Sequence, residues 1–199
     1  MSKRLATPVF LVLFAALAAT VSAADKPVPH RMKPALVVMD VQNAYLPYMD
    51  EKDKRIGLEQ INYVIALFRD NGFPVVRVYH TDLAEGPPPG SEPFAFPKSV
   101  AVLDSDPMVV KNYPNAFKKT ELDKLLREKG VDTVFLVGLS AVGCVLSTYH
   151  GADDLDYRVF MVKHALISHD AALTKSVYDI CSNISYSPLK LLLETARAQ

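Results

Sequence analysis

Residues 131–148 read V-D-T-V-F-L-V-G-L-S-A-V-G-C-V-L-S-T, a pattern that indicates the fold class. Its first part, residues 131–137, is largely apolar, which predicts a strand buried on both faces and ended by Gly138. Residues 138–144 then predict a tight turn into a helix over residues 143–155. A buried strand that leads directly into a helix is half of a β-α-β unit, so a parallel sheet is expected.

The same alternation continues in both directions along the chain. Further strands are expected over residues 35–39, 74–79, 108–110 and 158–163. Further helices are expected over residues 58–68, 120–130, 170–181 and 187–196. Strands and helices that alternate at this spacing predict an α/β fold with a mainly parallel sheet covered by helices on both faces.

The composition argues against several classes of function. The chain has 199 residues, of which 50% are hydrophobic and 22% charged, as expected of one folded domain. Its 22 Lys and Arg balance 22 Asp and Glu, so no basic excess indicates nucleic acid or an anionic membrane as a partner. Two cysteines are too few for a disulfide framework or a Cys-rich zinc module.

The first 23 residues predict a cleaved signal peptide. Lys3 and Arg4 are followed by an apolar run over residues 9–19, and residues 21–23 (V-S-A) have the small-x-small pattern of a cleavage site. The apolar run is shorter than the ~20 residues that span a bilayer. We therefore expect an extension over residues 24–33, a domain over residues 34–199, and a periplasmic or secreted protein without a membrane anchor. An uncleaved N-terminal tether is the alternative.

Three polar residues follow predicted strand ends, where ligands bind in parallel sheets. They are Asp40, Lys111 and, in the first turn of a helix, Cys144. A helix N-terminus and a nearby lysine both favour a thiolate, and an aspartate could take the thiol proton. Together they predict covalent catalysis. Each has a simpler reading, however: a buried thiol, a turn-forming Asp and a solvated Lys.

Three ordered motifs support the catalytic interpretation. Residues 35–45 (A-L-V-V-M-D-V-Q-N-A-Y), 111–122 (K-N-Y-P-N-A-F-K-K-T-E-L) and 138–148 (G-L-S-A-V-G-C-V-L-S-T) resemble the signatures of the isochorismatase-like cysteine hydrolases. The resemblance runs from about Pro34 to the C-terminus. It implies a Rossmann-like three-layer α/β/α sandwich.

The resemblance also implies roles for individual residues. Cys144 is the nucleophile, Asp40 the general base, and Lys111 the group that holds carboxylate and thiolate together. A cis peptide before Ser140 is implied, with the backbone N–H groups of Ser140 and Cys144 forming an oxyanion hole. Family members are commonly oligomers, so a homo-oligomer acting on a small molecule without a cofactor is expected.

Several features bear on the substrate. Members of the family that cleave the vinyl ether of isochorismate generally lack the cysteine, so Cys144 favours an amide, carbamoyl or ester bond. The chain departs from the family pattern at Ala141 and at His164, which puts the substrate's identity in doubt. An isochorismatase and a catalytically silent binding protein remain alternatives.

No metal site is expected. Nicotinamidases in the family bind a divalent ion through Asp and several His, but the chain has no histidine between Val41 and Tyr79. His80 alone is too few ligands, so a pocket or structural role is favoured for it. A flavodoxin-like nucleotide module is the other rival, but it needs a phosphate-binding loop after the first strand, and residues 40–44 (D-V-Q-N-A) form none. Cys181 is expected to be a buried structural thiol, and both cysteines to be free.

Aromatic residues near the motifs are expected to line the substrate pocket. The long proline-rich stretch over residues 81–107 predicts a functional loop. The expected substrate-binding residues are Tyr45, Phe94, Phe96, Tyr113 and Phe117. For Phe94 and Phe96 the alternative is that they anchor the loop to the core.

Overall fold

The protein is described by a computed structural model covering residues 31–82 and 84–198. The expected signal peptide and most of the expected extension lie outside these residues. The six strands are β1 (Pro34–Met39), β2 (Val75–His80), β3 (Met108–Lys111), β4 (Thr133–Leu139), β5 (Arg158–Ile167) and β6 (Asn183–Ile184). The α-helices are α1 (Glu51–Asp70), α2 (Leu122–Glu128), α3 (Leu146–Asp153), α4 (Ala171–Ile180) and α5 (Tyr186–Ala198). A 3₁₀ turn, Leu46–Tyr48, and a π-helical segment, Ala141–Val145, complete the described elements.

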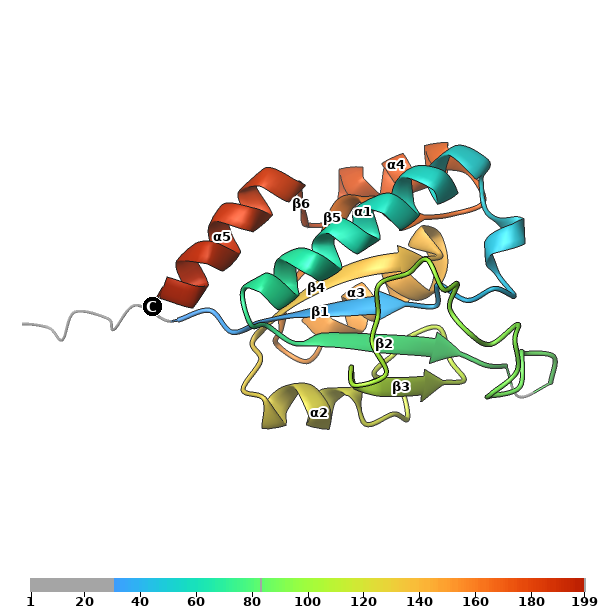
Figure 1. Ribbon diagram of the computed structural model, residues 1–199, viewed down its shortest axis with the longest axis horizontal. Helices are drawn as coiled ribbons and strands as arrows, with labels where there is room; N and C mark the ends of the chain where they lie inside the picture. Colours follow the sequence, from blue (N-terminus) through green and yellow to red (C-terminus); the bar gives the residue numbers. More distant parts are fainter. Residues whose placement is uncertain (1–30, 83, 199) are drawn as a thin grey trace, which may run out of the picture. The chain divides into compact units, whose positions relative to one another are not determined.

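The strands form one parallel sheet in the order β3-β2-β1-β4-β5-β6 (Figure 1). The order reverses between β1 and β4, because the chain builds one half of the sheet outward from β1 and then returns to begin the other half. In parallel sheets this switch point is where ligands bind, beyond the carboxyl ends of the strands. The α/β/α fold expected from the sequence is therefore confirmed, with the sheet parallel throughout.

Alternate residues of β1 face two separate apolar cores. Leu36 and Val38 pack in the core that includes α1 and α5. Ala35, Val37 and Met39 pack in the core that includes α2 and α3. Because both faces of the strand are covered, every residue of β1 is buried, and this explains its unbroken apolar sequence.

Helix α1 begins earlier than the sequence pattern predicted. The expected start was residue 58, whereas the helix starts at Glu51. The Asp50 side chain caps it by accepting a hydrogen bond from the backbone N–H of Asp53 at 2.9 Å, and Glu51 and Asp53 lie in the first turn. Capping and favourable charge start this helix, before its apolar face begins.

Gly138 does not end its strand, contrary to expectation. Strand β4 continues to Leu139, and Gly138 pairs with Met39 of β1 at a φ of 113°. A Cβ atom at Gly138 would lie 2.1 Å from the Met39 carbonyl oxygen. Glycine thus lets β1 and β4 approach closely just before the turn that carries Cys144. Strand β5 also runs beyond its expected end, through a register irregularity and through His164 at a φ of 65°.

Candidate active site

Four polar side chains meet at the carboxyl edge of the sheet. Asp40 follows β1, His80 ends β2, Lys111 ends β3, and Cys144 lies in the π-helical segment after β4. Strand β2 lies between β1 and β3, and His80 pairs in register with Lys111. The strand order therefore brings together residues that are far apart in the sequence, including all three expected catalytic residues.

The ammonium group of Lys111 is the centre of this cluster. Its Nζ lies 2.8 Å from Asp40 Oδ2, 3.1 Å from Cys144 Sγ and 3.1 Å from His80 Nδ1. The contacts with Cys144 and His80 are hydrogen bonds, and the contact with Asp40 is an ion pair. The Lys111 side chain has no exposed surface. It is therefore positioned to act on these three neighbours rather than on solvent.

The carboxylate of Asp40 is buried and paired. Neither of its oxygens has a hydrogen-bond partner of good geometry in the described part of the chain, so the Lys111 charge is its main compensation. Burial raises the pKa of the Asp40 carboxyl, and the charge of Lys111 opposes that rise. A carboxylate whose pKa is raised is a stronger base, which suits a group that has to accept a proton.

The thiol of Cys144 is protonated at rest. Burial and the negative charge of Asp40 raise its pKa to about 12, although Lys111 acts in the opposite direction. The sequence predicted a lowered thiol pKa, and this expectation was wrong because desolvation and the charge of Asp40 outweigh the lowering effect of Lys111. The thiol must therefore lose its proton during the reaction, and Asp40 is the base beside it.

His80 is held by residues of the first motif. The Gln42 side chain accepts a hydrogen bond from the His80 backbone N–H at 2.7 Å and donates one to its carbonyl oxygen at 3.0 Å. The hydroxyl of Tyr45 lies 3.4 Å from the same carbonyl oxygen. Burial and the charge of Lys111 lower the pKa of His80 to about 4, so the imidazole is neutral near pH 7. Sequence reasoning gave Gln42 no role, although it stands inside the quoted motif.

A small cavity of about 140 Å³ opens onto the cluster. Its lining residues are Asp40, Tyr45, Met49, His80, Leu139, Ser140 and Cys144. Among the expected substrate-binding residues, Tyr45 is placed at the cavity; Met49 was not expected there. A larger hollow of about 540 Å³, which includes Phe73 and Lys129, contains none of the motif residues expected to be catalytic.

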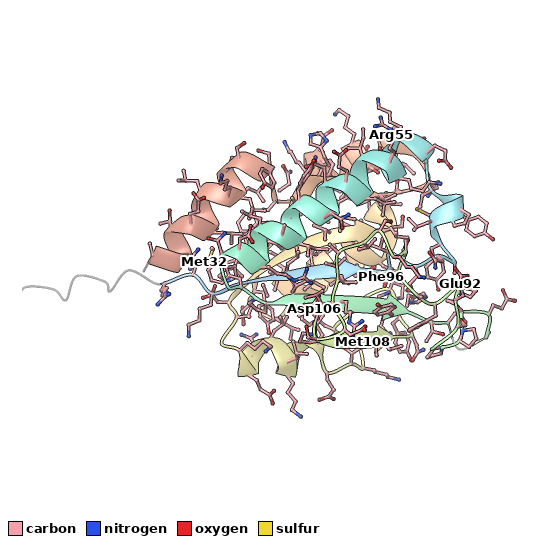
Figure 2. All side chains as sticks on the ribbon, in the orientation of Figure 1. Met32, Arg55, Glu92, Phe96, Asp106 and Met108 are labelled. Atoms are coloured by element: carbon pink, nitrogen blue, oxygen red, sulfur yellow. The ribbon has the colours of Figure 1, made fainter. Side chains whose placement is uncertain are left out.

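The other four aromatic residues lie elsewhere. Phe94 and Phe96 are buried against Tyr79, with ring centroids 4.9 and 4.3 Å away, and Figure 2 shows Phe96 lying over the sheet. Phe117 stacks on Tyr157. The rings of Tyr113 and of these three are not among the cavity-lining residues, so the structure does not bring them to the expected pocket.

The long loop is tied to the sheet by its backbone. The backbone N–H groups of Asn43 and Ala44 donate to the carbonyl oxygens of Ala95 and Pro93, both at 2.9 Å. The Asn43 side chain also donates to Glu92, which Figure 2 shows near the carboxyl ends of the strands. These bonds and the packing on Tyr79 correspond to the anchoring alternative for this loop.

The backbone around Ser140 has the form that the resemblance implied. The peptide bond between Leu139 and Ser140 is cis, and Ser140 lines the cavity beside Cys144. The second cysteine, Cys181, is buried in the core on the α2 and α3 side, and both cysteines are free. In the described residues, no cluster of three or more His, Cys, Asp or Glu side chains could hold a metal ion. Across the same residues, no helix combines the length and the apolar character needed to cross a membrane.

Comparisons with known proteins agree on one family. The isochorismatase domain family matches residues 34–180. The isochorismatase family protein YddQ of Bacillus subtilis is 30% identical over 139 residues, which are 67% of this chain and 77% of that protein. Maleamate amidohydrolase of Pseudomonas putida is 29% identical over 156 residues, which are 67% of this chain and 72% of that enzyme. The crystal structure of N-carbamoylsarcosine amidase from Thermoplasma acidophilum superposes with a TM-score of 0.68 at 27% identity, covering 77% of this chain and 95% of that one.

Proposed function

This chain belongs to the isochorismatase family of hydrolases, and from that premise we propose that it is a cysteine hydrolase that cleaves a small amide, carbamoyl or related acyl bond. The observation that carries the proposal is the placement of Cys144 and Asp40 around one buried ammonium group, with Lys111 Nζ 3.1 Å from the sulfur and 2.8 Å from the carboxylate. A nucleophile, a base and a fixed positive charge are the parts that acyl transfer through a thioester requires.

The first half of the reaction forms a thioester. Asp40 takes the proton of the Cys144 thiol as the sulfur attacks the carbonyl carbon of the substrate. The carbonyl oxygen becomes an oxyanion, for which the backbone N–H groups of Ser140 and Cys144 are the proposed donors. Protonated Asp40 then gives its proton to the leaving amine, the C–N bond breaks, and the acyl group remains on the sulfur.

The second half hydrolyses the thioester. Asp40 takes a proton from a water molecule, whose oxygen attacks the thioester carbonyl. The C–S bond then breaks, the carboxylic acid product forms, and the proton returns from Asp40 to the sulfur. The Lys111 ammonium compensates whichever of the two neighbours, carboxylate or thiolate, carries the negative charge.

Two observations favour an acyl substrate over the vinyl ether of isochorismate. Cys144 lines the cavity with its sulfur beside the Lys111 ammonium, where a nucleophile is needed. Relatives named maleamate amidohydrolase and N-carbamoylsarcosine amidase show that amide-cleaving enzymes occur among similar proteins. A silent binding protein remains the alternative, since loss of turnover need not disturb the fold.

The decisive experiment combines turnover with thiol labelling. A panel of small amides is assayed by ammonia release, and Cys144→Ser is expected to lose at least 10³-fold in kcat/KM for any amide that the wild type hydrolyses, because a hydroxyl near Asp40 is a far weaker nucleophile. Cys181→Ser, which changes the other free thiol, is the matched control and should retain turnover. Near-wild-type activity of Cys144→Ser, or no amide, carbamoyl or ester hydrolysis at all, would contradict the proposal.

We further propose that the enzyme is exported and that it assembles as a homo-oligomer. Export rests on the signal-peptide pattern of residues 1–23, and assembly rests on membership of a family whose members are commonly oligomers. Fractionation of cells that express the full chain should find the protein outside the cytoplasm, shortened at its N-terminus, and light scattering should give a mass above that of one chain. Full-length protein in the cytoplasm, or a monomer at micromolar concentration, would refute the corresponding part.

A further inference from the structure

His80 contacts the buried Lys111 and, like Asp40 and Cys144, lines the cavity. Its Nδ1 lies 3.1 Å from the Lys111 ammonium, and His80 is one of the residues that line the cavity. An ammonium nitrogen has no lone pair to offer, so Nδ1 must be the acceptor in this contact. In a neutral imidazole the proton is then on Nε2, and the ring has one N–H donor left.

That donor is unused within the described part of the chain. The hydrogen bonds of His80 there are made by its backbone groups and by Nδ1, and Nε2 has no partner. Gln42 holds the backbone of His80 on both sides, and the contact of Nδ1 with the Lys111 ammonium orients the ring. Strand pairing with Lys111 fixes the same residue in register.

The charges around the cavity restrict what this donor can recognise. Among the described residues no Lys or Arg lines the cavity, and the buried Lys111 already contacts Asp40, Cys144 and His80. A carboxylate on the substrate would lie near Asp40 without a cation to pair with, which is unfavourable in a buried site. The hydroxyl of Tyr45 stays neutral, since burial and Asp40 raise its pKa to about 12.

We propose that His80 is the specificity-determining residue of this site and donates its Nε2–H to a second carbonyl oxygen of a small uncharged substrate, such as a diamide. This inference rests on the proposed hydrolase function. The attacked carbonyl lies at Cys144, and the second carbonyl, one or two bonds away, lies at His80. A cavity of about 140 Å³ matches such a molecule and is well below the ~300–1,000 Å³ typical of sites for drug-sized ligands.

Three probes of similar size separate the recognition elements. Malonamide has two uncharged amides, malonamate replaces one of them with a carboxylate, and butyramide replaces it with an ethyl group. Each is tested for protection of Cys144 against iodoacetamide, with the alkylated residue identified by mass spectrometry of the full protein. Protection reports binding whether or not the probe is hydrolysed.

In the wild type, malonamide is expected to protect at about fivefold lower concentration than butyramide, as one added hydrogen bond predicts, and malonamate to protect least. His80→Asn should abolish the difference between malonamide and butyramide, because an Asn oxygen can still accept from Lys111 but nothing replaces the Nε2 donor. His80→Gln places an amide near the position of Nε2 and should restore part of the difference. His150→Asn, at an exposed histidine of α3, is the control and should change nothing.

The outcomes are separable from those of the hydrolase proposal. Equal discrimination by wild type and His80→Asn, stronger protection by malonamate than by malonamide, or no protection by any probe at 100-fold excess over the reagent would overturn the role of His80. None of these results bears on the role of Cys144 as nucleophile, which is tested by the loss of turnover in Cys144→Ser. If His80→Asn fails to fold, the wild-type preference among the three probes and the His80→Gln variant still decide the question.

Discussion

The Lys111 ammonium lies 2.8 Å from the Asp40 carboxylate, and the two side chains are 0% and 3% exposed. Because both charged groups are buried, each is stabilised mainly by the opposite charge of the other. The same ammonium also contacts Cys144, which couples the stability of the fold to the chemistry of the proposed site. Substitutions at this pair can therefore distinguish its contribution to stability from its contribution to catalysis.

Removing Lys111 should destabilise the protein strongly. Lys111→Met leaves the Asp40 carboxyl buried without a counter-charge, and we expect a loss of about 3–5 kcal/mol in the free energy of unfolding. The double variant Lys111→Met/Asp40→Asn should recover about 1–3 kcal/mol of this loss but no turnover. Urea denaturation measures both. Lys175→Met, which breaks an exposed ion pair with Asp179, is the control and should cost less than about 1 kcal/mol; equal costs for the two lysines would contradict the prediction.

Asp40→Asn should change thiol reactivity and turnover in opposite directions. The negative charge of Asp40 raises the pKa of Cys144, so removing it lowers that pKa from about 12, and the rate of alkylation by iodoacetamide should start to rise at a lower pH than in the wild type. Turnover should nevertheless be lost, because the base is gone. The pH profile of alkylation, measured by mass spectrometry, checks the direction. A profile that moves to higher pH would show that the carboxylate does not repel the thiolate.

Phe96 should contribute to the stability of the fold and not to substrate binding. Its ring lies 4.3 Å from that of Tyr79 and is buried, so Phe96→Ala is expected to lower the free energy of unfolding by about 3–4 kcal/mol. Protection of Cys144 by malonamide should stay within twofold of wild type at a temperature where the variant is folded. Tyr48→Ala, at a tyrosine 75% exposed, is the stability control. A stable Phe96→Ala with altered protection would place this ring in the pocket after all.

Gly138 should tolerate no side chain. In Gly138→Ala the new Cβ meets the Met39 carbonyl oxygen and the residue keeps a φ of 113°, so we expect a loss of more than about 3 kcal/mol or failure to fold. Gly143→Ala is the matched control, because the new Cβ would lie 3.7 Å from the Ser140 Cβ, an ordinary contact. Thermal melts of the two proteins should differ widely. Similar melting temperatures would mean that β1 and β4 can separate at little cost.

The sequence predicted the meeting of Asp40, Lys111 and Cys144 because each follows a strand, and parallel strands end at one edge. It could not predict the contact of His80 with Lys111, since that contact depends on β2 lying between β1 and β3. Nor could it predict the direction of the Cys144 pKa shift, which is decided by how completely the thiol is buried. Phe94 and Phe96 show a third limit: an apolar ring on a long loop fits a pocket wall and a core equally well until packing decides.

The strand order also has a consequence for how the chain folds. No strand of this sheet pairs with a neighbour through a hairpin, since all the pairings are parallel and each needs a crossover connection. Asp40 and Lys111 come into contact only after β3 has docked on β2 and β2 on β1. The connections between β1 and β2 and between β2 and β3 must therefore both close before either charge is compensated. Assembly dominated by such non-local contacts is slow. The charge pair thus forms late in folding, and a nascent chain released before β3 is complete has no Lys111 to compensate Asp40.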